Sequence, residues 1–125
     1  MLRPGDLTRL GDRAPIASYG GGGFRIGQTR HDGSILILAG GVYAWPSPDI
    51  ETGCAAIIER IRAREPADFF LLGTGATQIF PTAAVREAFE LAGLGIEPMA
   101  TSSACRTYNI LLAEQRHFAA GLIAI

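Results

Sequence analysis

Residues 68–99 read DFFLLGTGATQIFPTAAVREAFELAGLGIEPM, and this stretch decides the fold. It opens with a short continuous apolar run at 68–72, which is typical of a strand covered on both faces. A helix is predicted after Pro81-Thr82 and before Gly93, with an inward face made of Val85, Ala88, Phe89 and Ala92. Residues 95–99 read as a second strand. The stretch therefore predicts a strand–helix–strand unit with parallel strands.

Two similar units flank this one. A helix is predicted to run up to Arg64, because Cys54, Ile57, Ile58 and Ile61 recur at helical spacing. Either Ser47 or Thr52 is expected to cap it. Ser102 or Ser103 is expected to cap a third helix, whose apolar stripe is Ala104, Tyr108, Leu111 and Leu112. An apolar closing strand is predicted over 118–125.

The N-terminal part is rich in glycine, since half of the sixteen glycines fall between Gly20 and Gly41. Asp32-Gly33 is a two-residue hairpin signal, and it predicts antiparallel pairing of 24–30 with 34–39. A strand is also expected over 42–45. The run Gly20–Gly23 is interpreted as a turn or bulged strand start, and close approach of a ligand to this backbone is the alternative.

Together these elements predict a single domain over residues 1–125, an α/β three-layer sandwich. Its mixed sheet would combine an N-terminal antiparallel hairpin with strand–helix–strand crossovers. The chain has 125 residues, 48% hydrophobic content and a net charge of −1, which suits one domain and excludes disorder. No apolar stretch is long enough to span a membrane. No basic run exists, so nucleic acid is not expected as a partner.

The chain is expected to be cytoplasmic. Its first fifteen residues contain no apolar core of a secretory signal, and they carry Asp6 and Asp12. The two cysteines, Cys54 and Cys105, form no disulfide framework or metal-binding pair, which suits a reducing compartment.

Two loops are candidate ligand sites because they leave the carboxyl ends of predicted parallel strands and run into helix N-termini. These loops are 73–81 and 100–103, and their Gly, Thr and Ser residues offer donors to an anion. The predicted ligand-binding residues are Gly73, Thr74, Gly75, Phe80, Thr101, Ser102, Ser103, Arg106, Tyr108 and Asn109. The alternative is that they only form turns and caps. Tyr108 and Asn109 are also expected to hydrogen-bond the neighbouring loop and hold Phe80-Pro81.

Cys105 is the one candidate for catalysis. It lies in the first turn of the third predicted helix beside Arg106, and both features lower the pKa of a thiol. A nucleophile also needs a base, and neither His31 nor His117 is placed near it by the sequence. The alternative is a small buried residue. Trp45 is expected to be partly exposed and is a candidate partner contact.

No cofactor or metal is expected. The Gly73-Thr74-Gly75 run lacks the third glycine and the immediate helix of a dinucleotide-binding fingerprint. Two histidines and two cysteines scattered along the chain match no metal-ligand spacing.

The segments LLGTGATQIFP (71–81) and GIEPMATSSACRTYNILLAEQRHFAAGLI (95–123) resemble the small Mth938-like proteins. That family includes the mitochondrial complex I assembly factor subunit 3. The motif T-G-x-x-x-x-F-P begins at Thr74, and the motif A-x-R-T-Y-N begins at Ala104. The segments YGGGGFRIG (19–27) and GSILIL (33–38) fit as well, so the resemblance covers nearly the whole chain.

The resemblance implies a three-layer α/β fold and assigns no catalytic residues. It favours a non-enzymatic binding or assembly protein, whose partner is a respiratory complex subunit or another assembly factor. The alternative is a small-anion-binding protein or thiol enzyme that uses the loops at 73–81 and 100–106. Exposed edge strands also predict a homodimer.

Overall fold

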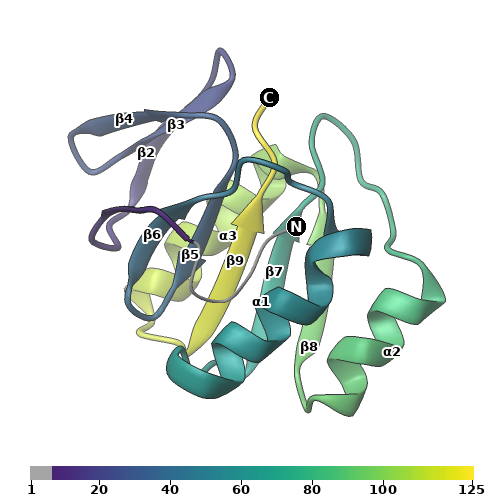
Figure 1. Ribbon diagram of the computed structural model, residues 1–125. Coiled ribbons are helices and arrows are strands. Elements are labelled where there is room, and N and C mark those ends of the chain that lie inside the picture. The colour runs from purple at the N-terminus through teal and green to yellow at the C-terminus, as the bar shows by residue number, and fades with distance from the viewer. Residues whose placement is uncertain (1–6) are drawn as a thin grey trace.

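A six-stranded mixed sheet forms the centre of the protein, as the computed structural model shows for residues 7–125 (Figure 1). Residues 1–6, on which the expected lack of a leader partly rests, lie outside the described residues. The strand order is β1-β6-β5-β9-β7-β8. These strands are β1 (Arg9–Gly11), β5 (Ile35–Leu38), β6 (Gly41–Ala44), β7 (Phe69–Gly73), β8 (Gly95–Met99) and β9 (Phe118–Leu122).

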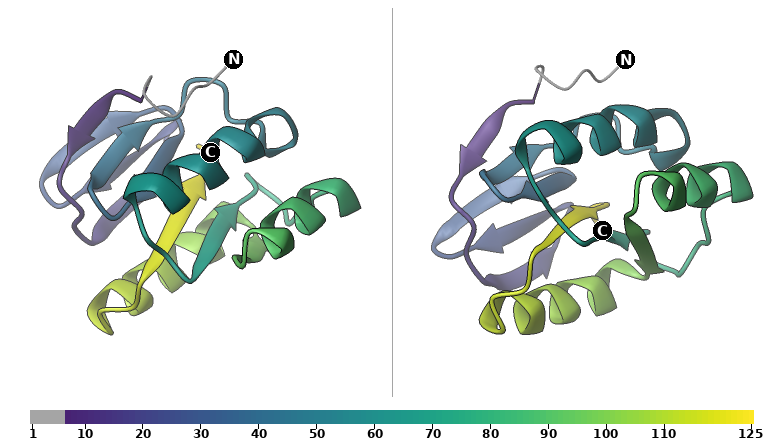
Figure 2. Two further views of the ribbon diagram at one scale, coloured as in Figure 1. Left: turned by 60° about the horizontal axis from the view of Figure 1, so that its bottom comes forward. Right: turned by 90° about the horizontal axis from the view of Figure 1, so that it is seen from below.

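Helices and a second sheet cover the two faces of the central sheet (Figure 2). The helices α1 (Ile50–Arg64) and α2 (Ala83–Leu91) lie on one face. The other face is covered by α3 (Thr101–Ala113) and by a small antiparallel sheet of β2 (Ile16–Gly20), β3 (Gly23–Ile26) and β4 (Thr29–Asp32). The predicted three-layer α/β architecture is confirmed.

Each face of the central sheet has its own apolar core. Phe70, Leu72 and Trp45 belong to the core beneath α1 and α2. Leu71 and Phe118 belong to the core beneath α3 and the small sheet. Alternate residues of β7 thus enter opposite cores, which explains why its sequence is a continuous apolar run.

The three predicted crossovers are present. β7 pairs in parallel with β8 on one side and with β9 on the other. Because the chain steps outward through α2 and returns through α3, right-handed connections place these two helices on opposite faces. The helix start after Thr82 is as predicted, and its hydroxyl accepts a hydrogen bond from Val85 N–H.

The hairpin predicted at Asp32-Gly33 is wrong. β3 pairs with β4 through a turn at Gly27-Gln28, whereas β5 pairs with β6 and β9. At Gly33, with φ of +88°, the chain leaves the small sheet and enters the central one. The chain does change direction at Asp32-Gly33, but this segment connects β4 of the small sheet to β5 of the central sheet, and these two strands do not pair with each other.

Three further expectations are corrected. Asp49 caps α1, accepting from Glu51 N–H at 2.9 Å, so neither Ser47 nor Thr52 does. α3 begins at Thr101 after Ala100 with no side-chain cap, so Ser102 and Ser103 do not fill that role. Trp45 is only 1% exposed, because it packs under Gly121, where an added Cβ would lie 2.8 Å from the indole ring.

The outer edge of β8 is partly blocked. Gly95 N–H and Met99 C=O bond toward β7, so Ile96 and Pro98 turn their backbone groups outward. Pro98 has no N–H, and its carbonyl accepts a hydrogen bond of 3.0 Å from the Gln78 side chain. Of the five residues of β8, Ile96 alone offers both backbone groups to another strand.

Candidate functional site

The two loops predicted to bind a ligand lie side by side at the carboxyl ends of β7 and β8. Thr74 N–H donates to Met99 C=O at 2.8 Å. Gly75 and Thr101 are joined twice, because Thr101 N–H donates to Gly75 C=O and Gly75 N–H donates to the Thr101 hydroxyl, both at 2.9 Å. The fold therefore brings together the residues 73–75 and 101.

The threonine hydroxyls of these loops hold the loops themselves. Thr101 donates to Ile123 C=O at 2.7 Å. Thr74 donates to Thr77 C=O at 2.6 Å and accepts from Ile79 N–H at 3.0 Å. Gly73 packs so closely that an added Cβ would lie 3.0 Å from the Thr101 hydroxyl. These contacts explain why glycine and threonine occur in the two loops. Gly73 leaves room for Thr101, and the two threonine hydroxyls hold the loop backbone in place.

Three other predicted residues lie at the start of α3, next to these loops. Ser102 is half-buried, and Ser103 and Arg106 are exposed. Ligand binding by the two loops stays a prediction. In the same loop Phe80 is 66% exposed, which is unusual for a large apolar side chain.

Tyr108 and Asn109 do not hold Phe80-Pro81, so that expectation is corrected. Asn109 accepts from Ile16 N–H at 2.8 Å and donates to Ile16 C=O at 2.9 Å. Tyr108 donates to Ala14 C=O at 2.9 Å. Both side chains bind the segment around β2, far along the sequence, and so attach the small sheet to α3.

Cys105 lies on the buried face of α3, with 2% of its surface exposed. Burial raises the pKa of its thiol to about 12, because the thiolate would lose its hydration. This shift is opposite to the lowering that its position in the first helical turn suggests. At neutral pH the folded protein therefore holds Cys105 as an unreactive thiol.

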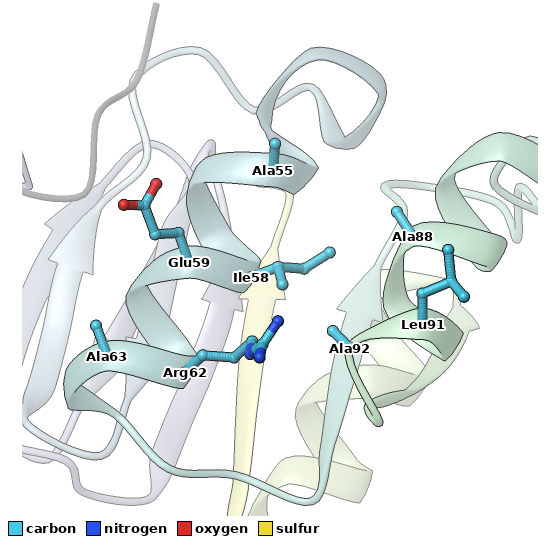
Figure 3. A pocket seen from close by; sticks show the side chains of 8 residues that line it. All are labelled: Ala55, Ile58, Glu59, Arg62, Ala63, Ala88, Leu91 and Ala92. Atoms are coloured by element: carbon cyan, nitrogen blue, oxygen red, sulfur yellow. The ribbon is translucent and has the colours of Figure 1, made fainter.

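A groove between α1 and α2 is the most prominent feature that sequence reasoning missed (Figure 3). The cavity measures about 590 Å³, and its lining includes Ile58, Glu59, Arg62, Ala88, Leu91 and Ala92. Ile58 and Arg62 extend from α1 toward α2. Leu91 is 81% exposed at the groove. The available signal was this leucine, which lies outside the predicted inward stripe of its helix.

Hydrogen bonds join the two helices at their N-terminal ends. Glu51 on α1 accepts from both the Thr82 hydroxyl, at 2.7 Å, and Thr82 N–H, at 3.1 Å. Farther along, the facing side chains Ala88 and Ala92 are too short to fill the space beside Ile58.

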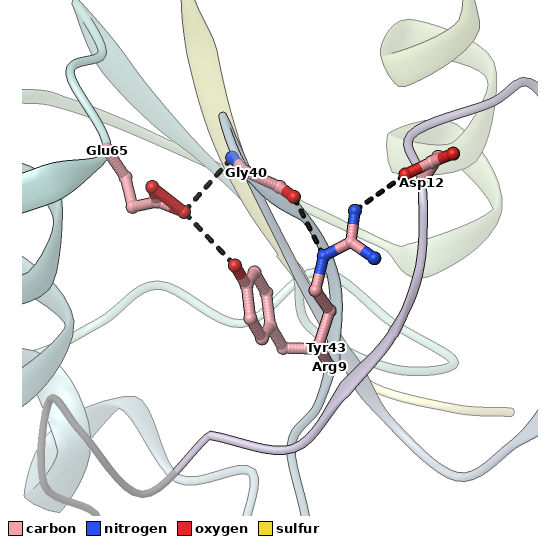
Figure 4. A network of polar contacts seen from close by, with 5 residues as sticks. All are labelled: Arg9, Asp12, Gly40, Tyr43 and Glu65. Atoms are coloured by element: carbon pink, nitrogen blue, oxygen red, sulfur yellow. Dashed lines mark hydrogen bonds and ion pairs between the residues drawn. The ribbon is translucent and has the colours of Figure 1, made fainter.

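A buried carboxylate, Glu65, follows the end of α1 and holds the β5–β6 turn (Figure 4). It accepts from Gly40 N–H at 3.0 Å and from the Tyr43 hydroxyl at 3.4 Å. The Gly40 carbonyl accepts from Arg9, which also pairs with Asp12 at 2.6 Å. An added Cβ at Gly40 would lie 2.7 Å from the Glu65 carboxylate and 2.9 Å from the Tyr43 hydroxyl, so a larger residue would have to displace the ends of these two side chains from the clamp.

Comparison with known families places the chain. Residues 16–123 match the family described as "Protein of unknown function (DUF498/DUF598)". The chain belongs to this family. It is 35% identical over 109 residues to an uncharacterized protein of Rhodobacter capsulatus, covering 87% of this chain and 83% of that protein.

A relative with a named role comes from Danio rerio. It is the NADH dehydrogenase [ubiquinone] 1 alpha subcomplex assembly factor 3, 30% identical over 109 residues. The match covers 86% of this chain and 63% of that protein, so this chain spans less than two thirds of the relative's length.

Solved structures share the fold. An outer membrane protein from Bartonella henselae matches with a TM-score of 0.81 and 31% identity, covering 93% of this chain and 98% of that one. A Mth938-like domain from Bordetella pertussis matches with a TM-score of 0.69 and 27% identity, covering 88% and 85%. The resemblance to Mth938-like proteins is thereby confirmed.

Residues 7–125 contain neither a candidate membrane-spanning helix nor a candidate metal site. None of their helices has the length and apolar content needed to cross a bilayer. Within the same residues, no three His, Cys, Asp or Glu side chains are grouped so that they could hold a metal ion.

Proposed function

We propose that this protein is a non-enzymatic, cytoplasmic binding protein that assists assembly of a respiratory complex, with a complex I subunit as its client. The observation that carries the proposal is the 30% identity to the Danio rerio assembly factor, which extends over 86% of the present chain. A thiol reaction at Cys105 is not part of the proposal, because that side chain is buried and protonated.

The groove between α1 and α2 is the docking surface in this proposal, and its occupant is an amphipathic helix of the client. Leu91 is 81% exposed, and its burial by a partner would contribute about 1.5–3 kcal/mol. Short side chains beside Ile58 leave room for an apolar residue of the incoming helix.

Charge sets the register of the docked helix. Glu59 and Arg62 lie one turn apart on α1 at the groove; Arg62 extends toward α2, whereas Glu59 points away from it along the outer wall (Figure 3). A client helix with a basic and an acidic residue flanking its apolar anchor would pair with both. Such complementarity favours a polar-flanked helix over a purely apolar ligand.

Site-specific photocrosslinking in the native cells tests this proposal. A benzoylphenylalanine at position 91 is expected to capture a subunit of the respiratory complex, identified by mass spectrometry. The matched control is position 110, since Ile110 is 53% exposed on α3, which covers the opposite face. Capture of a second copy of this chain at position 91, or of the same proteins from both positions, would contradict the proposal.

A functional arm completes the test. Leu91→Asp is expected to reduce the assembled complex on a native gel, because a carboxylate cannot be buried in the groove without cost. Ile110→Asp should leave assembly unchanged. Equal assembly with both variants would exclude the groove as the docking surface.

A further inference from the structure

A second cavity lies at the end of the central sheet opposite the two ligand-loop candidates. It measures about 360 Å³ and sits where α3 ends and β9 begins. Gln115, Arg116, His117 and Phe118 line it from this connection, and Arg13 lines it from the segment between β1 and β2. Among residues 7–125, none of the side chains that line it is acidic.

Arg13 is the central cation of this cavity. Its guanidinium carbon lies 4.9 Å from the centre of the Phe118 ring. The Arg13 side chain hydrogen-bonds Tyr108, but its Nε is buried and has no hydrogen-bond partner among residues 7–125. A buried donor left unpaired costs free energy, and an oxyanion is the partner that a guanidinium binds most strongly.

Arg116 gives the cavity a second cation for an anionic ligand. Arg116 has its guanidinium carbon 5.9 Å from the Phe69 ring, and its ion pair with Glu114 is long, at 3.8 Å, with both side chains about half exposed. Such a pair contributes little and is readily exchanged for a ligand.

The aromatic floor is rigid and gives the cavity an apolar side. Phe118 is buried, stacking on Phe69 at 5.8 Å and meeting Tyr108 edge-on at 5.6 Å. Leu112 adds a further apolar wall. A ligand here would therefore combine a charged group with a short apolar part.

We propose that this cavity binds a small organic anion, with its carboxylate or phosphate on the Arg13 and Arg116 guanidinium groups and its apolar part against Leu112. The site is separate from the α1/α2 groove and from the loops at 73–81 and 100–106. The proposal holds whether or not the protein has a client subunit.

An NMR titration of the ¹⁵N-labelled full chain tests it, with inorganic phosphate and butyrate as separate probes. We expect saturable shifts of the backbone amides at 115–118, with a Kd below about 1 mM. Saturation by phosphate alone would assign a phosphoryl ligand, and saturation by butyrate alone a carboxylate. Non-saturable shifts with both probes, or shifts confined to 76–78 and 102–106, would overturn the proposal.

Matched variants separate a specific site from general charge. Arg116→Gln and Arg13→Gln should each weaken binding about tenfold or more, because each removes a charge-assisted donor. Arg25→Gln removes the same charge from the one exposed position of β3 and should leave Kd unchanged. If Arg13→Gln fails to fold, Arg116→Gln decides alone. An equal loss of affinity in Arg25→Gln would show that only net charge matters.

Discussion

The two layers that cover the central sheet are held by different kinds of contact. On the α1/α2 side, the core beneath the helices is apolar, and the polar link between the helices is the exposed pair of Glu51 and Thr82. On the other side, Asn109 and Tyr108 hydrogen-bond the backbone of the small sheet.

This difference has a consequence for function. Directional hydrogen bonds fix the register of the small sheet on α3, so little freedom is left there. Beyond the hydrogen bonds between Glu51 and Thr82, short side chains leave space between α1 and α2, and a groove results. The layer of α3 and the small sheet is therefore fixed by its hydrogen bonds, whereas the layer of α1 and α2 leaves an open groove.

The largest expected effect tests whether both layers depend equally on aromatic packing. Phe118→Ala removes a ring that contacts Phe69 and Tyr108, and Phe89→Ala removes one that stacks on Phe70. Each should lower the free energy of unfolding by about 3–5 kcal/mol, measured by urea denaturation. A cost below about 1 kcal/mol for Phe89→Ala would show that α2 is only loosely packed.

The next effect tests the polar attachment itself. Asn109→Ala leaves both backbone groups of Ile16 without their side-chain partner and should cost about 2 kcal/mol. Hydrogen exchange should become faster in β2 and β3 before it does in β7. Ser103→Ala, at an exposed position of the same helix, should stay within about 0.5 kcal/mol. Equal costs for the two variants would remove the distinction between the layers.

Much of the parallel half of the chain could be predicted from sequence. The apolar run of β7 and the helical spacing of Ile57, Ile58 and Ile61 report burial directly, and burial is what the fold requires of them. The end of α2 before Gly93 follows from the positive φ of that glycine, +75°.

The N-terminal half could not be predicted in the same way. A turn signal such as Asp32-Gly33 specifies local backbone geometry, but not which strands lie on either side of it. Asn109 likewise gave no sign that its partner is Ile16, because that pairing depends on tertiary structure. The groove was missed since it results from the spacing of two helices, not from any one motif.

A smaller effect concerns Cys105, on the α3 side. The pKa of the Cys105 thiol rises from 9.0 to about 12 on folding. Between these two values of pH, the thiol is protonated in the native state and deprotonated in the unfolded state. Stability should be at its full value below pH 9 and fall above it, by no more than about 1.4 kcal/mol per pH unit. Urea midpoints at rising pH measure this fall.

Two controls accompany the Cys105 measurement. Cys105→Ala should flatten the dependence on pH, whereas Cys54→Ala should keep it. Iodoacetamide at neutral pH should modify Cys105 only after unfolding. Rapid modification of Cys105 in the folded protein would mean that the α3 layer opens more readily than its hydrogen bonds suggest.

The smallest expected effect sharpens the comparison most. Leu91→Asp should change the free energy of unfolding by no more than about 0.5 kcal/mol, because the side chain is already in water. Thermal unfolding measures this directly. A large loss of stability would mean that Leu91 belongs to the core. That result would contradict the interpretation of the groove as an interaction surface.

The partly blocked outer edge of β8 limits how this protein can associate. With Pro98 lacking a donor and Gln78 occupying its carbonyl, the strand cannot template a continuous ladder from a neighbouring molecule. Self-association by extension of the central sheet would have to use β1, at its far side, and the small sheet offers its own edge strands, β2 and β4. Fibrillar stacking on the β8 edge of the central sheet is therefore disfavoured.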